Sequence, residues 1–379
     1  MFGRLLTMVL IAAFSASTPV SAADWVARID IPAASPAPWP AEFGAVDINI
    51  PCPYTMSGKC DLDGFLDWQN VCALYVLSGG QPALYRERSE KGACKSNRKR
   101  ERYGVASITK SVVSLLYGEA LSADPALAID RPAAEALAKV GVAYPREDVT
   151  IRDLLQMSSG MKWRDRGPEA AVIRITTSGG AGDPATLAKS VNAFLPKATF
   201  GGRGVYNYSG FDTTMIGLIA DGGQRRLETL FRTKLWSEIG AGRAARWKAD
   251  EGGTPAPYCC LQMGPEDLAK IGQWVLDALK QGGARAGWIR ASVTDTRPSR
   301  LKCSADGDRK PVAYGYQWWV PPLTDGGFTA IGKGGQYLHI FPKQNVVIAQ
   351  LSDDRRAGSP TNSCGAFFAH RAIANALAR

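Results

Sequence analysis

The 379-residue chain contains only two histidines, His339 and His370. His339 lies in an apolar run with the pattern of a strand, and His370 lies in the last helical segment, so we expect both to be structural. A Ser-His-Asp triad needs a positioned histidine, and the Gly-x-Ser-x-Gly motif of a nucleophile elbow is also absent. The chain has no Cys-x-x-Cys pair either, which argues against a zinc site. A nucleophilic serine here would therefore need a base other than histidine, and we expect no metal.

Long hydrophobic runs are also missing after the first residues of the chain. Arg4, an apolar stretch over residues 5–14 and the small residues 20–22 have the pattern of a secretory signal peptide. The apolar stretch is too short to span a bilayer, and no later stretch is long enough and free enough of charge to do so. We therefore expect residues 1–22 to be removed near Ala22, leaving a periplasmic or secreted protein without a transmembrane segment.

Eight cysteines fit an oxidising compartment, because an even number in an exported chain indicates disulfides. Pairing cannot be deduced from sequence alone. Cys52 with Cys60 and Cys72 with Cys94 would close short local loops, and Cys303 with Cys364 would tie the C-terminal region. For the adjacent cysteines 259 and 260 we expect bonds to different partners rather than to each other.

The chain is basic, with 45 Lys and Arg against 35 Asp and Glu and a formal net charge of +10. The densest cluster comprises Lys95, Arg98, Lys99, Arg100 and Arg102. Such runs are usually solvated loops, and the functional alternative is steering of anionic substrates or docking on an anionic envelope surface. Aromatic residues are not interleaved with these cations, so we expect no nucleic-acid partner.

Strand patterns occur at both ends of the chain and helical patterns between them. This order predicts an α+β fold, with an antiparallel sheet built from distant segments, flanked by helices and carrying an inserted, mostly helical lobe. We expect an N-terminal arm over residues 23–66 and a main domain over 67–379. Within that domain, residues 67–123 and 290–379 form the α/β lobe and 124–289 the helical lobe. The predicted strands are 71–77, 83–87, 314–320, 327–331, 336–341 and 346–351, and the main predicted helices are 151–157, 184–195, 211–222, 227–239, 265–280 and 365–377.

Ser107 and Lys110 form a Ser-x-x-Lys motif at the start of a predicted buried helix. Residues three apart on a helix share a face, so the amine can lie beside the hydroxyl. Helix starts also present unpaired N–H groups that stabilise negative charge. The alternative is a simple N-cap serine followed by a solvated lysine. Three other matches have poorer context: Ser96 in a charged loop, Ser159 in a turn, and Ser299 directly after a proline.

Five segments in order resemble the serine β-lactamase and penicillin-binding-protein superfamily. The similarity is greatest to its branch with class C β-lactamases, family VIII carboxylesterases and 6-aminohexanoate-dimer hydrolases, and it extends roughly from residue 71 to the C-terminus. The resemblance implies a β-lactamase/transpeptidase-like fold. The segments are 105–111 (VASITKS), 149–163 (VTIRDLLQMSSGMKW), 208–217 (YSGFDTTMIG), 260–272 (CLQMGPEDLAKIG) and 332–336 (GKGGQ).

The resemblance also implies a mechanism without a cofactor. Ser107 would attack a carbonyl and become acylated, and Lys110, with its charged form disfavoured by desolvation, would accept or relay the serine proton. Tyr208 would serve as partner base and as acid to the leaving group. The spacing to Gly217 selects Tyr208, although Tyr206 offers a second phenol. The backbone N–H groups of Ser107 and Gln336 would form the oxyanion hole.

Two departures bear on the substrate. Relatives that bind β-lactams usually carry Asn two residues after the tyrosine, where this chain has Gly210. The third motif has Gly334 in place of Thr or Ser. Lys333, Gly334, Gly335 and Gly210 remain candidate substrate-binding residues. We therefore expect an exported serine hydrolase of carboxylesterase or amidase type, acting on a small-molecule ester or amide. The alternatives are a DD-peptidase or β-lactamase, and a non-catalytic envelope-binding module.

Overall fold

A computed structural model of the chain describes residues 27–44, 47–55, 59–88, 90, 92–164, 186–224, 226–305, 308–353 and 360–378. The predicted signal peptide, residues 1–22, lies outside these ranges. Among the described residues no helix is long and apolar enough to cross a membrane.

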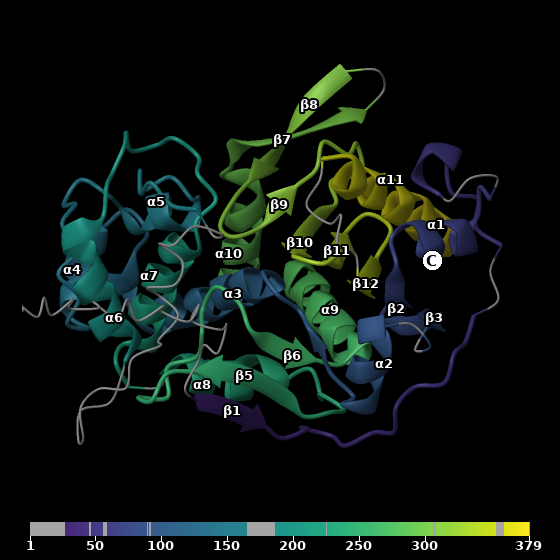
Figure 1. Ribbon diagram of the computed structural model, residues 1–379, viewed down its shortest axis with the longest axis horizontal. Helices are drawn as coiled ribbons and strands as arrows, with labels where there is room; N and C mark the ends of the chain where they lie inside the picture. The colour runs from purple at the N-terminus through teal and green to yellow at the C-terminus, as the bar shows by residue number, and fades with distance from the viewer. Residues whose placement is uncertain are drawn as a thin grey trace, which may run out of the picture.

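An antiparallel sheet forms the centre of the fold, with strand order β3-β2-β12-β11-β10-β9-β8-β7 (Figure 1). Segments far apart in the sequence meet in this sheet, because β2 pairs with β12. Near the top of Figure 1, β7 and β8 form a ribbon that projects beyond the other strands. The strands are β2 Val71–Ser78, β3 Gln81–Glu87, β7 Arg297–Ala305, β8 Asp308–Tyr314, β9 Trp319–Val320, β10 Phe328–Gly332, β11 Gln336–Phe341 and β12 Val346–Ser352.

Helices bury both faces of this sheet. Successive residues of a strand point to opposite faces, and those of β12 accordingly enter two different hydrophobic clusters. Val347 and Ala349 pack with residues of α9, whereas Val346 and Ile348 pack with residues of α1 and α11. Burial on both faces explains why β2, β11 and β12 are almost continuously apolar. The covering helices are α1 Leu62–Trp68, α9 Pro265–Gln281 and α11 Pro360–Leu377.

A second, smaller sheet with strand order β1-β5-β6-β4 and a group of helices lie beside the large sheet (Figure 1). Helix α3 passes through the centre of the molecule, and twelve of its sixteen residues are buried. The small strands are β1 Ala27–Ile31, β4 Tyr103–Gly104, β5 Ala245–Ala249 and β6 Leu261–Met263. The helices are α2 Gly92–Lys99, α3 Ile108–Ala123, α4 Ala133–Ala138, α5 Ile151–Leu155, α6 Leu187–Phe194, α7 Gly210–Asp221, α8 Arg226–Leu230 and α10 Gly283–Thr294, with a π-helical turn at Phe231–Trp236 and 3-10 turns at Cys52–Tyr54, Pro125–Leu127 and Leu195–Lys197.

The predicted α+β class, an antiparallel sheet flanked by helices, is confirmed. The predicted strand over 314–320 is broken between β8 and β9, where Gln317 has a positive φ of 67°. Ser96 lies within α2 and not in a loop; it is half-buried, while Lys95 and Lys99 of the same helix are exposed. The sequence reading also missed α10 and β7. The division into an arm and two lobes remains a prediction; β1 from the arm pairs with β5 from the predicted helical lobe.

Four disulfides are present, and three join the pairs that would close local loops or tie the C-terminal region: Cys52–Cys60, Cys72–Cys94 and Cys303–Cys364. The expectation for the two adjacent cysteines is wrong. Cys259 and Cys260 are bonded to each other, since the other six cysteines already pair among themselves and leave no other partner.

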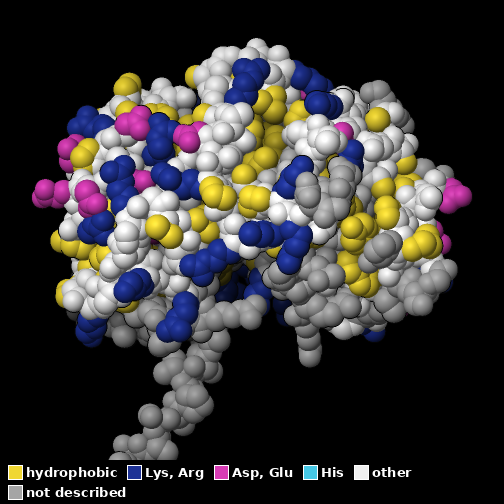
Figure 2. All heavy atoms as spheres, turned by 90° about the horizontal axis from the view of Figure 1, so that it is seen from above, with side chains coloured by type: hydrophobic (Ala, Val, Ile, Leu, Met, Phe, Trp, Pro, Cys, Tyr) yellow, Lys and Arg dark blue, Asp and Glu magenta, His cyan; other side chains and the backbone are white. Residues whose placement is uncertain are grey.

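The basic cluster is partly neutralised. Arg98 lies 3.1 Å from a Glu87 carboxylate oxygen and over the ring of Trp39, while Lys95, Lys99 and Arg100 are exposed. Burial, reinforced by the nearby Arg246 guanidinium, lowers the pKa of Arg102. Figure 2 shows Lys and Arg side chains spread across the middle of one face, with Asp and Glu mainly toward its edges.

Candidate active site

The predicted nucleophile, Ser107, is the N-cap residue of α3, but its side chain caps no backbone N–H. It follows Ala106, whose φ is +48°, a left-handed conformation that is uncommon for a residue with a side chain. The Ser107 hydroxyl instead accepts a hydrogen bond of 3.1 Å from Lys110 Nζ. Ser107 thus occupies the N-cap position without a capping bond from its side chain, and its hydroxyl is hydrogen-bonded to the amine one helical turn away.

Lys110 is enclosed, with 1% of its surface exposed. Its amine also donates to the backbone carbonyl of Tyr258 at 2.9 Å, and it lies over the rings of Tyr208 and Tyr258 at 4.9 and 5.5 Å from their centroids. Among the described residues no carboxylate lies within ion-pair distance of this amine. Lys110 is thus surrounded by a hydroxyl, a carbonyl and two aromatic rings.

Of the two candidate tyrosines, Tyr208 lies over Lys110. Its ring packs against Trp319 at 5.7 Å and edge-on against Tyr314 at 6.1 Å. Tyr206 packs against the same aromatic pair, at 5.5 Å from the Tyr314 ring and 6.4 Å from the Trp319 ring. The phenol ring over Lys110 is therefore that of Tyr208, and Tyr206 has a packing position in the same cluster.

The glycine-rich third motif forms the turn between β10 and β11, next to the nucleophile loop. A Cβ on Gly332 would lie 2.4 Å from the carbonyl oxygen of Val105, so only glycine allows this close approach. Gly334 and Gly335 have φ of 92° and 83°, which glycine adopts without strain. Lys333 at the tip of the turn is exposed.

Gln336 is held by its side chain in the large sheet. Its Nε2 donates to the Ser352 carbonyl at 2.8 Å, and its Oε1 accepts from the Ser352 N–H at 3.1 Å. These bonds fix the first residue of β11 against β12. The side chain is therefore occupied, which leaves the backbone N–H as the group for the predicted oxyanion role.

Gly210 begins α7, directly after Tyr208 and the N-cap residue Ser209. Ser209 Oγ accepts from the N–H of Asp212 at 3.1 Å. Burial raises the pKa of the Asp212 carboxyl to about 8, although the Ser159 hydroxyl donates to it at 2.7 Å. Ser159, one of the competing Ser-x-x-Lys serines, thus joins the 149–163 segment to the helix that follows Tyr208.

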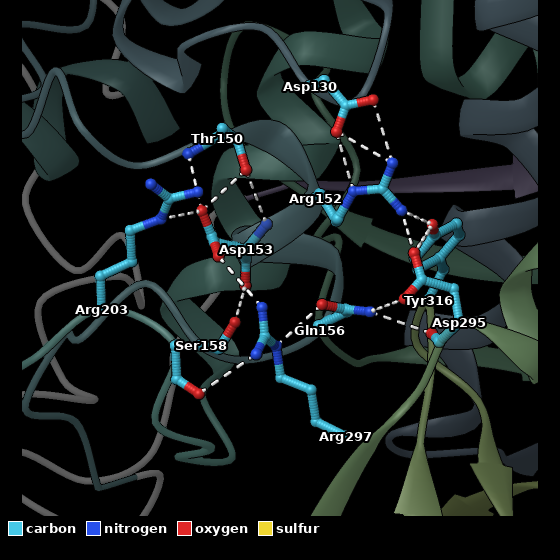
Figure 3. Close-up of polar contacts among 11 residues, drawn as sticks. Asp130, Thr150, Arg152, Asp153, Gln156, Ser158, Arg203, Asp295, Arg297 and Tyr316 are labelled. Atoms are coloured by element: carbon cyan, nitrogen blue, oxygen red, sulfur yellow. Dashed lines mark hydrogen bonds and ion pairs between the residues drawn. The ribbon is translucent and has the colours of Figure 1, made fainter.

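A polar network holds that segment in place (Figure 3). The buried Asp153 carboxylate accepts from the Thr150 N–H at 2.9 Å and from Arg203 Nε at 2.6 Å, while Arg297 from β7 lies 3.5 Å away. Figure 3 also shows Arg152 directed toward Asp130, Asp295 and Tyr316.

Met157, within this segment, contacts the loop that contains Tyr208 and precedes α7, here named the tyrosine loop. The Met157 carbonyl accepts from the Asn207 N–H at 2.7 Å, and its sulfur contacts the Ser209 N–H at 3.2 Å. The backbone on both sides of Tyr208 is thereby tied to the 149–163 segment.

Two groups that support the candidate site were not predicted from the sequence. One is the Tyr258 carbonyl, which accepts a hydrogen bond from Lys110 Nζ. The other is Gln317, whose backbone carbonyl accepts from Ser111 Oγ at 2.6 Å and whose side chain binds Thr213 Oγ1 at 2.8 Å and the Leu155 carbonyl at 2.8 Å. Gln317 thus connects α3, α7 and α5. The only sequence signal was a polar residue inside an apolar predicted strand.

The two histidines lie together in the core, as a structural role predicts. Their Nδ1 atoms are 3.3 Å apart, and His370 Nε2 lies 2.8 Å from the Gln350 side-chain oxygen. Burial lowers the pKa of His370 to about 3, and burial with the neighbouring imidazole holds the pKa of His339 well below its ordinary value.

A cavity of about 510 Å³ lies beside the tyrosine loop. Its wall includes Asn207, next to Tyr208, together with Trp163 and three cationic residues: Lys162, Arg164 and Arg300. Among the described residues that line it there is no Asp or Glu. The cavity therefore presents positive charge one residue away from the candidate tyrosine.

The chain is similar in sequence and in fold to known proteins. A 6-aminohexanoate-dimer hydrolase from Paenarthrobacter ureafaciens is 28% identical over 158 residues, and this match spans 40% of the present chain and 40% of that relative. A Bacillus anthracis protein assigned as a 6-aminohexanoate-dimer hydrolase superposes with a TM-score of 0.68 at 19% identity, covering 93% of this chain and 91% of that one.

A class C β-lactamase superposes with a TM-score of 0.57 at 11% identity, over 82% of this chain and 93% of its own. At such identities the likeness establishes the fold, and it confirms the predicted β-lactamase/transpeptidase-like architecture. The sequence model of the family described as Beta-lactamase matches residues 70–364, well over half of the chain. This protein therefore belongs to the Beta-lactamase family.

Proposed function

We propose that the protein is a serine hydrolase that cleaves an ester or small amide through an acyl-enzyme on Ser107. The observation that carries the proposal is the hydrogen bond of 3.1 Å between Lys110 Nζ and Ser107 Oγ, made by an amine with no carboxylate in ion-pair distance among the described residues. A hydroxyl paired with an enclosed amine is the arrangement of a Ser-Lys nucleophile.

In the first half-reaction the Ser107 oxygen bonds to the substrate carbonyl carbon, and its proton passes by way of Lys110 and Tyr208 to the leaving alcohol or amine. The N–H groups of Ser107 and Gln336 stabilise the oxyanion. In the second half-reaction water adds its hydroxyl to the acyl carbon, and its proton returns to the serine oxygen. The carboxylic acid is released without a cofactor.

Two residues favour esters and small amides over β-lactams. Gly210 has no side chain to grip a substrate amide, and Gly334 has no hydroxyl beside the acyl group. A DD-peptidase or β-lactamase activity is the alternative, which turnover of nitrocefin or stable acylation by penicillin would favour. We place the protein in the periplasm or outside the cell, a compartment in which its four disulfides form and persist.

The cationic cavity favours substrates that carry a carboxylate. Lys162 and Arg300 line this cavity, and both side chains are exposed. Solvent and salt therefore weaken the attraction of each for an anion, and the two attractions add. We expect Lys162→Gln/Arg300→Gln to lower kcat/KM roughly three- to tenfold for a p-nitrophenyl monoester of a dicarboxylic acid. The neutral p-nitrophenyl ester of equal length is the control and should be unaffected. Equal effects on the two esters would show that the cavity does not recognise the substrate carboxylate.

The decisive experiment is turnover of p-nitrophenyl butyrate by the purified protein and by Ser107→Ala. A fluorophosphonate should add one adduct, located at Ser107 by mass spectrometry of the digested protein. Ser96→Ala and Ser299→Ala, at two competing Ser-x-x-Lys matches, are the matched controls and should keep full activity. A fully active Ser107→Ala variant would refute the proposal, and a lack of turnover of any ester would favour the non-catalytic alternative.

A further inference from the structure

The segment over residues 257–261, here named the bracing segment, contacts the nucleophile region at both of its ends. Near its start the Tyr258 carbonyl accepts from Lys110 Nζ at 2.9 Å. At its end the Leu261 carbonyl accepts from the N–H of Val105 at 3.0 Å, two residues before Ser107. The bracing segment therefore holds the nucleophile loop and the lysine together.

A third contact fixes the start of the bracing segment on α7. A Cβ on Gly217 would lie 2.2 Å from Pro257, so the proline ring packs directly on the helix backbone. This position is the last residue of the tyrosine motif. The contact packs the bracing segment against the helix that follows Tyr208, and it leaves little freedom for Pro257 to move.

The Cys259–Cys260 disulfide lies between these anchors. A bond between adjacent cysteines closes a small ring through the intervening peptide and restricts the backbone on both sides. Cys260 has a φ of 78°, a conformation that L residues rarely adopt. The Cys259 carbonyl accepts from Trp247 Nε1 at 3.2 Å, so two successive carbonyls of the bracing segment have different donors: Lys110 for Tyr258 and Trp247 for Cys259.

We propose that the Cys259–Cys260 disulfide is a positioning element of the active site, which holds the Tyr258 carbonyl as a fixed acceptor for the Lys110 amine. The inference rests on the proposed function. Without the disulfide, Cys260 relaxes to a negative φ and the peptide planes of the bracing segment rotate. The Tyr258 carbonyl then moves away from Lys110, and the amine loses one of its two hydrogen-bond acceptors. The amine is then no longer oriented toward Ser107 Oγ.

This role has a signature that a purely stabilising disulfide lacks. Loss of the acceptor lowers kcat, because the Lys110 amine is less well oriented toward Ser107, and it leaves the KM for a small ester unchanged. A disulfide that only stabilises the fold would change the melting temperature and leave kcat in place.

The test begins with a non-reducing peptide map of the protein. It should show residues 259 and 260 joined to each other; free thiols at both positions would overturn the inference. The variant Cys259→Ser/Cys260→Ser is then compared with the wild type in kcat, KM and melting temperature, with p-nitrophenyl butyrate as the substrate. We expect kcat about tenfold lower, the effect of a lost hydrogen bond, and an unchanged KM. Cys52→Ser/Cys60→Ser, which removes another local disulfide, is the control and should change neither.

A second variant separates the backbone conformation from the sulfur atoms. Glycine adopts a φ of 78° without strain, so Cys259→Ser/Cys260→Gly should recover part of the lost kcat. A folded Cys259→Ser/Cys260→Ser variant with an unchanged kcat would overturn the inference, even if its melting temperature falls.

Failure of the proposed function is recognised separately. A wild-type protein that neither turns over esters nor reacts with fluorophosphonate refutes the proposed function and this inference together. A wild type that reacts, with a Cys259→Ser/Cys260→Ser variant that behaves identically, refutes only the inference.

Discussion

Replacement of Lys110 by Met separates catalysis from folding. Methionine has a similar length and no amine, so Lys110→Met removes the hydrogen bonds to Ser107 Oγ and to the Tyr258 carbonyl while it fills the same space. General acid–base catalysis by a positioned side chain contributes about 100- to 10,000-fold. We therefore expect kcat/KM to fall by this factor, which corresponds to about 3–5 kcal/mol of transition-state stabilisation.

The effect on folding should be much smaller. The Tyr258 carbonyl loses this donor, and a lost intramolecular hydrogen bond costs about 1 kcal/mol. Against this, a methionine buried at a position that is 1% exposed gains apolar contacts, so part of the loss is offset. We expect the melting temperature to change by only a few degrees, as measured by circular dichroism, with an unaltered far-UV spectrum.

The matched control is Lys302→Met. Lys302 also ends a Ser-x-x-Lys match, but it lies exposed on β7 and is separate from the candidate site. This variant should hydrolyse p-nitrophenyl butyrate at the wild-type rate. The reasoning would be refuted by a folded Lys110→Met protein with activity within threefold of the wild type, or by an equal loss in both variants.

Two further predictions follow from buried contacts. Gly332→Ala should push β10 away from the Val105 carbonyl, which its Cβ would approach to 2.4 Å, and lower kcat/KM by at least about tenfold. Gly287→Ala in α10, with open space around its Cβ, is the control and should be neutral or stabilise by up to about 1 kcal/mol in urea unfolding; equal activity in both would contradict this account. Burial also lowers the pKa of His370 to about 3. The unfolded state therefore binds a proton below pH 6.5 that the folded state does not, so the free energy of unfolding should fall by about 2 kcal/mol between pH 7 and pH 5 from this residue. His370→Gln should reduce that fall, and an unchanged pH dependence in the folded variant would show that His370 does not cause it.

Much of the fold and the candidate site could be predicted because the relevant patterns are local. Helix α3 follows from apolar residues at helical spacing, and β11 is predicted from 336 to 341 as the structure has it. The Ser-x-x-Lys geometry is also local, since one helical turn brings Lys110 beside Ser107. The absence of suitable histidines then left Lys110 or a tyrosine as the expected base.

Other features depend on contacts between distant segments. The Tyr258 carbonyl reaches Lys110 across 148 residues, and Gln317 reaches Thr213 across 104. Periodicity cannot reveal such pairs, because they arise only when packing closes the intervening chain. The broken strand at Gln317 has the same cause, since its polar contacts to three helices override the local preference for a continuous strand.

By itself, the sequence determined the secondary-structure class, the order of the motifs and the Ser107–Lys110 pair, because each depends on residues near one another in the chain. Only the tertiary structure decided what surrounds that pair. It brought the Tyr208 ring over the amine and Gly332 against the nucleophile loop. It also brought the Tyr258 carbonyl, next to the Cys259–Cys260 disulfide, to the amine. The physical reason is that the environment of a buried amine consists of whatever the folded chain packs around it, and here those groups come from segments that are adjacent only in space.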